Sequence, residues 1–185
     1  MGMDVYGENP KTITEQPTRP ETENYDSDEW SAYWEARREW EQENPGAYFR
    51  NNVWWWRPLW DYVHAICEDV ITEEDWKSGH HNDNHLIDEA KCEIISERLA
   101  HELALGKVTK YKEERQKFLD NLPNQPCSTC EGSGKGAHYS AGKDTCHTCK
   151  GTGEQEHFDK GYPFEEDNVR EFEAFVRASG GFRIN

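Results

Sequence analysis

The stretch Ala47 to Trp60, AYFRNNVWWWRPLW, is the densest aromatic segment of the chain and gives the first indication of its fold. Tyr48 to Trp56 is rich in aromatic residues, which favour strands, and predicts a strand. Arg57-Pro58 predicts the start of a helix, because proline suits the first helical turn. The segment therefore predicts a strand that runs directly into a helix, with most of its rings in a core.

The three consecutive tryptophans of this segment, Trp54 to Trp56, cannot all point inward from a strand, because successive side chains alternate between its faces. At least one ring is expected at the surface or beneath another element. A ligand or partner pocket built from these rings is the alternative to a purely structural role. Apolar residues then recur on one face of the following helix: Leu59, Trp60, Val63, Cys67, Val70 and Ile71.

Shorter patterns on both sides of this segment predict the remaining elements. Met3 and Val5 predict an N-terminal strand, and the proline- and threonine-rich residues 11–23 predict a loop. Asp26 and Glu29 resemble a capping box at the start of a helix over residues 29–43, whose tryptophans lie at helical spacing and are expected to pack on the body. Further helices are predicted over residues 86–105, 109–121 and 165–179, and a last short strand over residues 182–184. Together these elements predict a mainly helical α+β fold, with about five helices around a small aromatic-rich sheet.

Two copies of one eight-residue pattern carry the clearest chemistry in the sequence. They are Cys127 to Gly134, CSTCEGSG, and Cys146 to Gly153, CHTCKGTG. One tight Cys-x-x-Cys turn presents two thiolates to an ion, and two such turns complete the tetrahedral shell that Zn(II) prefers. The glycines strengthen this prediction, because the chain after each pair must curl so that backbone N–H groups point at sulfur. The sequence predicts one structural zinc ion bound by Cys127, Cys130, Cys146 and Cys149.

The alternative interpretation is that these cysteines are ordinary thiols or a redox motif. A redox Cys-x-x-Cys pair lies at a helix start after a strand, whereas these two pairs flank a polar, glycine-rich loop. No hydrophobic signal segment precedes the chain, which predicts the reducing cytoplasm and argues against disulfides. His138, His147 and His157 lie near the motifs, but four cysteines already suffice as ligands.

The Cys-x-x-Cys-x-Gly-x-Gly pattern resembles the cysteine-rich zinc module of the DnaJ co-chaperones. That module carries four such motifs and two zinc ions, so the resemblance implies a single zinc ion for the two motifs of this chain. The sequence has no His-Pro-Asp tripeptide of a J domain, and stimulation of a chaperone ATPase is not implied. Two-motif versions resembling this one occur in small regulators such as the anti-TRAP protein and in some phage antitermination proteins.

Flanking prolines and the residues 157–163 predict that the zinc finger is an insertion between two helices. The predicted domains are therefore a body formed by residues 1–122 and 157–185 and a DnaJ-type zinc finger formed by residues 123–156. Within the body, MGMDVYGENP, YFRNNVWWWRPLWDY and EFEAFVRASGGF resemble a set of small phage and bacterial proteins that brings no assigned activity. Against that pattern, residues 11–45 are a further insertion.

The chain is strongly acidic, with a formal net charge of −16. Twelve acidic and four basic side chains lie in residues 1–45. Nucleic-acid affinity comes mainly from Lys and Arg, so direct nucleic-acid binding is disfavoured, as is an anionic membrane surface. No apolar run approaches the roughly 20 residues that span a bilayer. The acidic helix over residues 26–43 is either a solvated surface or a partner-facing element that mimics DNA.

A second cluster of possible metal ligands lies in Gly79 to His85, GHHNDNH: His80, His81, Asp83 and His85. Imidazoles with a carboxylate would suit a catalytic zinc, iron or manganese ion. The spacing lacks a His-Glu-x-x-His pattern, and Asn82-Asp83-Asn84 favours a turn and helix cap instead.

Three functions remain compatible with the sequence. The favoured one is a cytoplasmic, zinc-binding protein-interaction module, a regulator or inhibitor of a host protein of the phage or mobile-element type, with no catalytic residues. The second is an acidic nucleic-acid mimic that blocks a DNA-binding or defence protein. The third is a metal-dependent hydrolase centred on the His80–His85 cluster.

Overall fold

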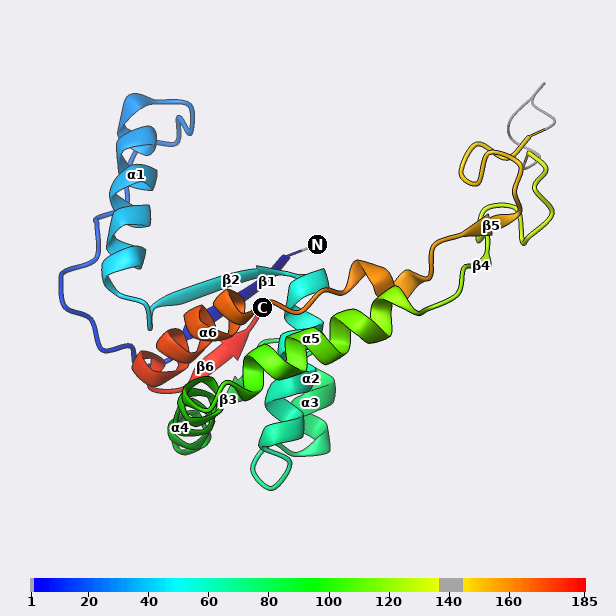
Figure 1. Cartoon of the computed structure of the whole chain (residues 1–185). Helices are drawn as coiled ribbons and strands as arrows, with labels where there is room; N and C mark the ends of the chain where they lie inside the picture. The colour runs from blue at the N-terminus through cyan, green and yellow to red at the C-terminus, as the bar shows by residue number, and fades with distance from the viewer. Residues whose placement is uncertain (1, 137–144) are drawn as a thin grey trace. The chain divides into compact units, whose positions relative to one another are not determined.

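The computed structural model describes residues 2–136 and 145–185 (Figure 1). The contacts divide the chain into two compact units: Met1–Lys110 with Phe164–Asn185, and Tyr111–Pro163. The predicted zinc finger, residues 123–156, lies within the second unit. No helix in the described ranges is long and apolar enough to cross a membrane.

The described residues form a mainly helical α+β fold, which confirms the predicted fold class. A four-stranded antiparallel sheet has the order β2-β1-β6-β3, and a two-stranded sheet joins β4 and β5. The helices are α1 (Asp28–Glu43), α2 (Val53–Ile66), α3 (Glu73–Ser78), α4 (Glu89–Ala104), α5 (Lys107–Asp120) and α6 (Glu166–Ser179), with a 3₁₀ turn η1 (Phe158–Gly161). The strands are β1 (Gly2–Gly7), β2 (Tyr48–Asn52), β3 (His85–Ile87), β4 (Gln125–Pro126), β5 (Glu154–Gln155) and β6 (Phe182–Ile184).

The core of the first unit lies on one face of the four-stranded sheet. Alternate strand residues on that face are buried: Met3, Val5, Phe49, Ile87, Phe182 and Ile184. Rings from α6 pack against them, with Phe172 at 5.2 Å and Phe175 at 5.8 Å from Phe49 between ring centroids. The opposite alternation places Tyr6, Arg50 and Leu86 on the other face, where they are exposed. Helix α6 therefore packs on one face of the sheet. The opposite face, called the open face below, carries exposed side chains and is bordered by α1 at a pocket discussed below.

The aromatic segment that forms β2 and the first turns of α2 differs from its prediction. The strand ends at Asn52 and the helix begins at Val53, so the three tryptophans are helical and not extended. The Asn52 side chain caps α2 by accepting hydrogen bonds from the backbone N–H groups of Trp54 and Trp55, both at 3.0 Å. Trp56 is fully buried, whereas Trp54 and Trp55 are 40% and 42% exposed. The expectation that not all three rings face inward is confirmed.

Helix α1 packs along the loop that precedes it. The Trp30 indole N–H donates to the Thr22 carbonyl and the Trp40 indole N–H to the Thr14 carbonyl, both at 2.9 Å. Trp30 and Trp40 therefore contact the preceding loop, residues 11–25. The sequence instead predicted that these tryptophans pack on the body. The N-cap is Ser27, whose side chain accepts from the Trp30 N–H, so the predicted capping role of Asp26 is wrong.

The region before α4 also differs from its prediction. His85–Ile87 forms strand β3, which pairs with Phe182–Ile184. The N-cap of α4 is Asp88, so the predicted helix cap in residues 82–84 is wrong. In contrast, α6 and β6 follow the predicted ranges closely, and Gly180 ends α6 with φ +60°.

Candidate metal centre

Four cysteine sulfur atoms converge in the second unit. The side chains of Cys127, Cys130, Cys146 and Cys149 are buried, and their Sγ atoms all lie within 4.8 Å of one another. Cys127 Sγ is 3.9 Å from Cys146 Sγ, and Cys130 Sγ is 3.7 Å from Cys149 Sγ. A tetrahedron with zinc–sulfur bonds of about 2.3 Å has sulfur–sulfur edges of roughly 3.8 Å. The four cysteines therefore fit one zinc ion, and the separations are too long for disulfides.

The two motifs are related by an approximate two-fold symmetry that their sequence repeat predicts. The Cys127 N–H donates to the Gly153 carbonyl at 2.8 Å, and the Cys146 N–H donates to the Gly134 carbonyl at 2.9 Å. Equivalent hydroxyl groups of Thr129 and Thr148 meet at 2.9 Å. These reciprocal contacts hold the two Cys-x-x-Cys turns face to face, so the sulfur cluster belongs to neither motif alone.

Glycine is required where the two motifs approach most closely. A Cβ atom on Gly134 would lie 2.5 Å from the Gly151 carbonyl oxygen, and one on Gly153 would lie 2.4 Å from the Gly132 carbonyl oxygen. Both residues also have positive φ, +70° and +78°. Steric exclusion and backbone conformation together explain the last glycine of each motif.

The same backbone curl directs N–H groups toward sulfur. Gly134 N–H donates to Cys130 Sγ at 3.2 Å, and Gly153 N–H donates to Cys149 Sγ at 3.3 Å. Burial opposes ionisation of Cys149, but hydrogen bonds from the backbone N–H groups of Gly153 and Gly151 and from neighbouring cysteine thiols outweigh it and lower the pKa of this thiol to about 6. For Cys130, burial and the neighbouring sulfurs together raise the pKa. Four thiolates this close repel one another, and a divalent cation relieves that repulsion.

The second predicted cluster does not form a metal site. His80 Nε2 lies 3.1 Å from Asp61 Oδ1, and His85 Nε2 lies 2.9 Å from Asp75 Oδ1, so the two imidazoles have different carboxylate partners. His81 and Asp83 are exposed. In residues 2–136 and 145–185 the four cysteines are the only group of three or more such side chains placed to hold a metal ion. The histidines near the motifs are not among them: His147 is exposed, His157 caps η1, and His138 lies outside the described residues.

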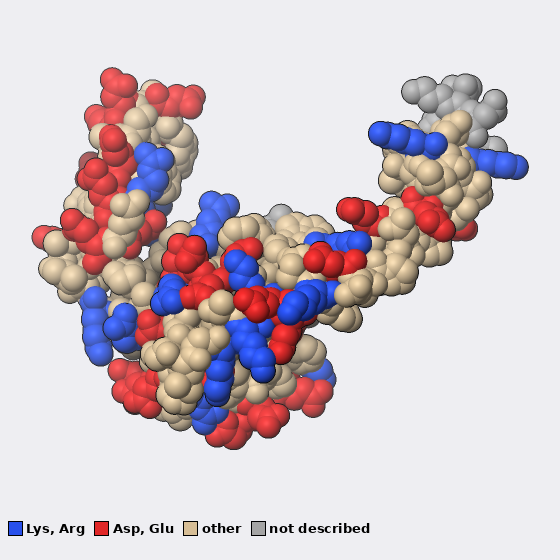
Figure 2. Space-filling model, viewed as in Figure 1, with Lys and Arg blue, Asp and Glu red and all other residues tan. Residues whose placement is uncertain are grey.

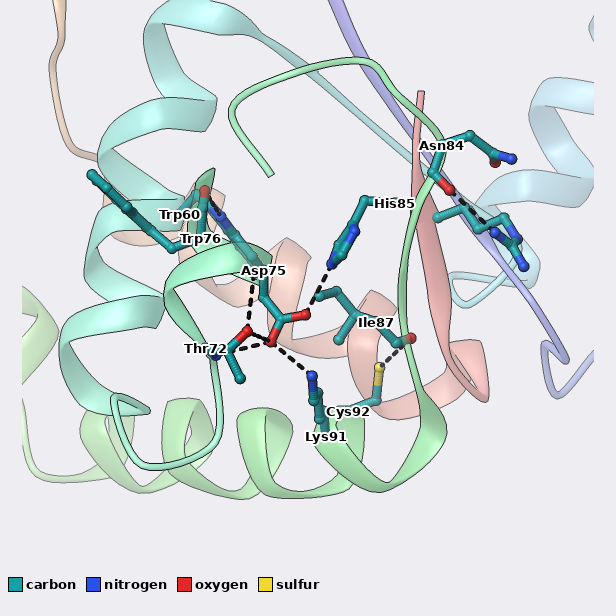
Figure 3. Close-up of polar contacts among 10 residues, drawn as sticks. Trp60, Thr72, Asp75, Trp76, Asn84, His85, Ile87, Lys91 and Cys92 are labelled. Carbon is teal, nitrogen blue, oxygen red and sulfur yellow. Dashed lines mark hydrogen bonds and ion pairs between the residues drawn. The ribbon is translucent and has the colours of Figure 1, made fainter. Parts of the chain in front are cut away.

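The structure instead reveals a buried ionic network around Asp75, which the sequence analysis missed (Figure 3). Asp75 accepts hydrogen bonds from Lys91 Nζ at 2.7 Å and from Thr72 Oγ1 at 2.7 Å, in addition to its contact with His85. Burial opposes ionisation of Asp75, but these donors hold its pKa below the usual range. The Thr72-x-x-Asp75 spacing of a capping box was the available signal. The network joins α3, β3 and α4.

The two remaining cysteines, Cys67 and Cys92, are both buried in the first unit. Burial raises the pKa of the Cys67 thiol to about 11 and that of the Cys92 thiol to about 12. Both thiols are therefore protonated at neutral pH.

No family model, curated protein or solved structure matches this chain. The assignment of a metal centre therefore rests on the cysteine geometry.

Proposed function

We propose that the second unit is a zinc-stabilised protein-interaction module, and that the cysteine cluster holds one structural zinc ion. The observation that carries this proposal is the four-sulfur shell: with four thiolates bound, a tetrahedral zinc ion has no open position for a substrate or water. A closed site of this kind stabilises a fold and does not catalyse a reaction. The resemblance to DnaJ-type modules supports the same interpretation.

Two exposed rings in the same unit support a protein partner. Phe118 on α5 and Phe158 on η1 are 57% and 55% exposed. Their elements are joined within the unit, because the Arg115 guanidinium donates two hydrogen bonds, at 3.1 and 2.9 Å, to the Tyr162 carbonyl. Exposed aromatic residues are enriched in protein interfaces. We assign the partner-binding surface to these two rings together with the zinc-stabilised turns, in a regulator or inhibitor of another protein.

Co-purification from the native host tests this function. Wild type, Cys127→Ser and the double variant Phe118→Ser/Phe158→Ser are compared, with Ile13→Ser as the control, since Ile13 is 81% exposed in the first unit. We expect one protein to be captured by wild type and by the control but by neither of the other variants. A partner retained by both Cys127→Ser and the double variant would contradict an interface on the second unit.

A second function, mimicry of nucleic-acid charge, is favoured by the carboxylates of α1. Asp28, Glu35, Glu39 and Glu43 are exposed and recur at spacings of seven and four residues, which aligns them on one helix face. Figure 2 shows acidic side chains along this helix. If this face binds a basic partner, reversing these four charges and raising the salt concentration both weaken the captured complex. A complex insensitive to both changes would exclude this function.

A further inference from the structure

The open face of the sheet carries a pocket of about 360 Å³ whose lining differs from the rest of this acidic chain. Three arginines, Arg37, Arg38 and Arg50, line it together with three aromatic residues and a single carboxylate, that of Glu41. Arg37 and Arg38 come from α1, and Arg50 comes from β2. Positive charge is therefore concentrated at one point of a chain with a net charge of −16.

The three arginines are not equally engaged. Arg37 is held by Glu41, with Nε at 2.7 Å from Oε1, and by the Tyr33 hydroxyl at 3.2 Å. Within residues 2–136 and 145–185, the exposed Arg50 side chain has only a long ion pair with Asp4, at 3.6 Å. Arg38 has no hydrogen bond or ion pair with the described part of the chain. The guanidinium of Arg38 is thus available to a ligand, and that of Arg50 nearly so.

The aromatic residues supply flat surfaces on three elements, β1, β2 and α1. Tyr6 and Tyr48 lie side by side on β1 and β2, with ring centroids 5.1 Å apart, and Tyr6 is 42% exposed. Trp34, from α1, is 50% exposed and also lines the pocket. Exposed rings beside guanidinium groups are the usual means of stacking a nucleobase while binding its phosphate.

We propose that this pocket binds a nucleoside monophosphate, with the phosphate on Arg38 and Arg50 and the base against the rings of Tyr6, Tyr48 and Trp34. The volume lies within the range of small-ligand sites and suits one nucleotide. The ligand is either a free nucleotide or the 5′-terminal nucleotide of a short single strand. A long nucleic acid is disfavoured, because the acidic residues elsewhere on the chain repel its phosphates.

This inference goes beyond the proposed function, because the pocket lies in the first unit and the zinc module in the second. Loss of a protein partner and loss of nucleotide binding are therefore separate results. A peptide carrying phosphotyrosine presents similar chemistry, but it would not need aromatic residues on three elements, and it serves as the competing ligand in the test.

The test is calorimetric titration of the full zinc-loaded chain with the four nucleoside monophosphates, with adenosine and inorganic phosphate as partial ligands. We expect saturable binding of at least one monophosphate, tighter than adenosine or phosphate alone. Arg38→Gln should weaken that binding about tenfold, because it removes a charge-assisted bond to phosphate. Trp34→Leu should weaken it through loss of stacking, and the control Arg170→Gln should leave it unchanged, since Arg170 pairs with Glu166 on α6.

A 5′-phosphorylated hexanucleotide identifies the source of the ligand: tighter binding than the monophosphate assigns the end of a strand, and weaker binding assigns the free nucleotide. The proposal is overturned if no monophosphate binds, if Arg38→Gln and Arg170→Gln bind equally well, or if only the phosphotyrosine peptide binds.

Discussion

In the second unit, the two motifs depend on backbone geometry at their glycines as much as on the zinc-binding chemistry of their cysteines. The four cysteines were predictable because Cys-x-x-Cys spacing is a local pattern. The contact between Thr129 and Thr148 was not predicted, although the two residues occupy the same place in the repeat. Their meeting depends on the symmetry with which the two motifs pack, and this symmetry appears only in three dimensions.

Gly153→Ala tests this geometry. We expect a lower zinc affinity, because the new Cβ would lie 2.4 Å from the Gly132 carbonyl oxygen and force the two motifs apart. Gly106→Ala is the matched control, since Gly106 also has a positive φ, +67°, but a Cβ there would meet nothing within 4 Å. Zinc affinity is measured by competition with a chelator. Equal affinity for both variants would show that close packing of the motifs is not needed for binding.

The Asp75 network makes a prediction about stability. Asp75→Asn leaves Lys91 and His85 without their carboxylate and should lower the free energy of unfolding by about 3 kcal/mol at pH 7. Asp69→Asn should cost clearly less, because the carboxylate of the Asp69–Arg98 pair is exposed to solvent. Urea unfolding of the two variants and wild type provides the measurement, and similar losses would argue against a special role for the buried network.

The pH dependence of this effect follows from the lowered pKa of Asp75. A carboxyl group whose pKa is lower in the folded state than in the unfolded state stabilises the fold above the unfolded pKa, about 3.9. That contribution decreases as the pH falls below this value and is lost when the folded carboxyl is protonated. The difference between wild type and Asp75→Asn should therefore shrink on acidification below about pH 4.

At the level of elements, the sequence predicted those whose signals are local. Helix α6 and strand β6 follow from an apolar helical period, a terminal glycine and a short apolar strand. Strand β3 was missed because it has three residues and pairs with β6, which lies far away in the sequence. The start of α2 was misplaced because aromatic residues suit both strands and buried helices. In that case the Asn52 cap decides between the two.

Asn52→Ala tests the role of this cap. The change removes the side chain that accepts from Trp54 N–H and Trp55 N–H, and it should lower the free energy of unfolding by about 1 kcal/mol. Asn52→Asp is the control, because aspartate caps helices about as well as asparagine. Unfolding followed by tryptophan fluorescence gives the measurement. A loss of the same size in both variants would assign the effect to something other than capping.

For the whole molecule, the division into two units predicts that metal removal acts locally. The core of the first unit is built from aromatic and aliphatic side chains and contains none of the four clustered cysteines. A chelator should therefore unfold the second unit around its motifs while the near-ultraviolet circular dichroism of the buried tryptophans persists. Loss of that signal together with zinc would show that the first unit depends on the metal.

The central claim is that Cys127, Cys130, Cys146 and Cys149 bind a single zinc ion. Native mass spectrometry of the purified chain tests it most directly, with Cys92→Ala as the control for a buried cysteine outside the cluster. We predict one zinc ion per chain in wild type and in the control, and loss of tightly bound zinc in Cys127→Ser. A wild-type chain without zinc, or Cys127→Ser with wild-type zinc content and affinity, would contradict the account.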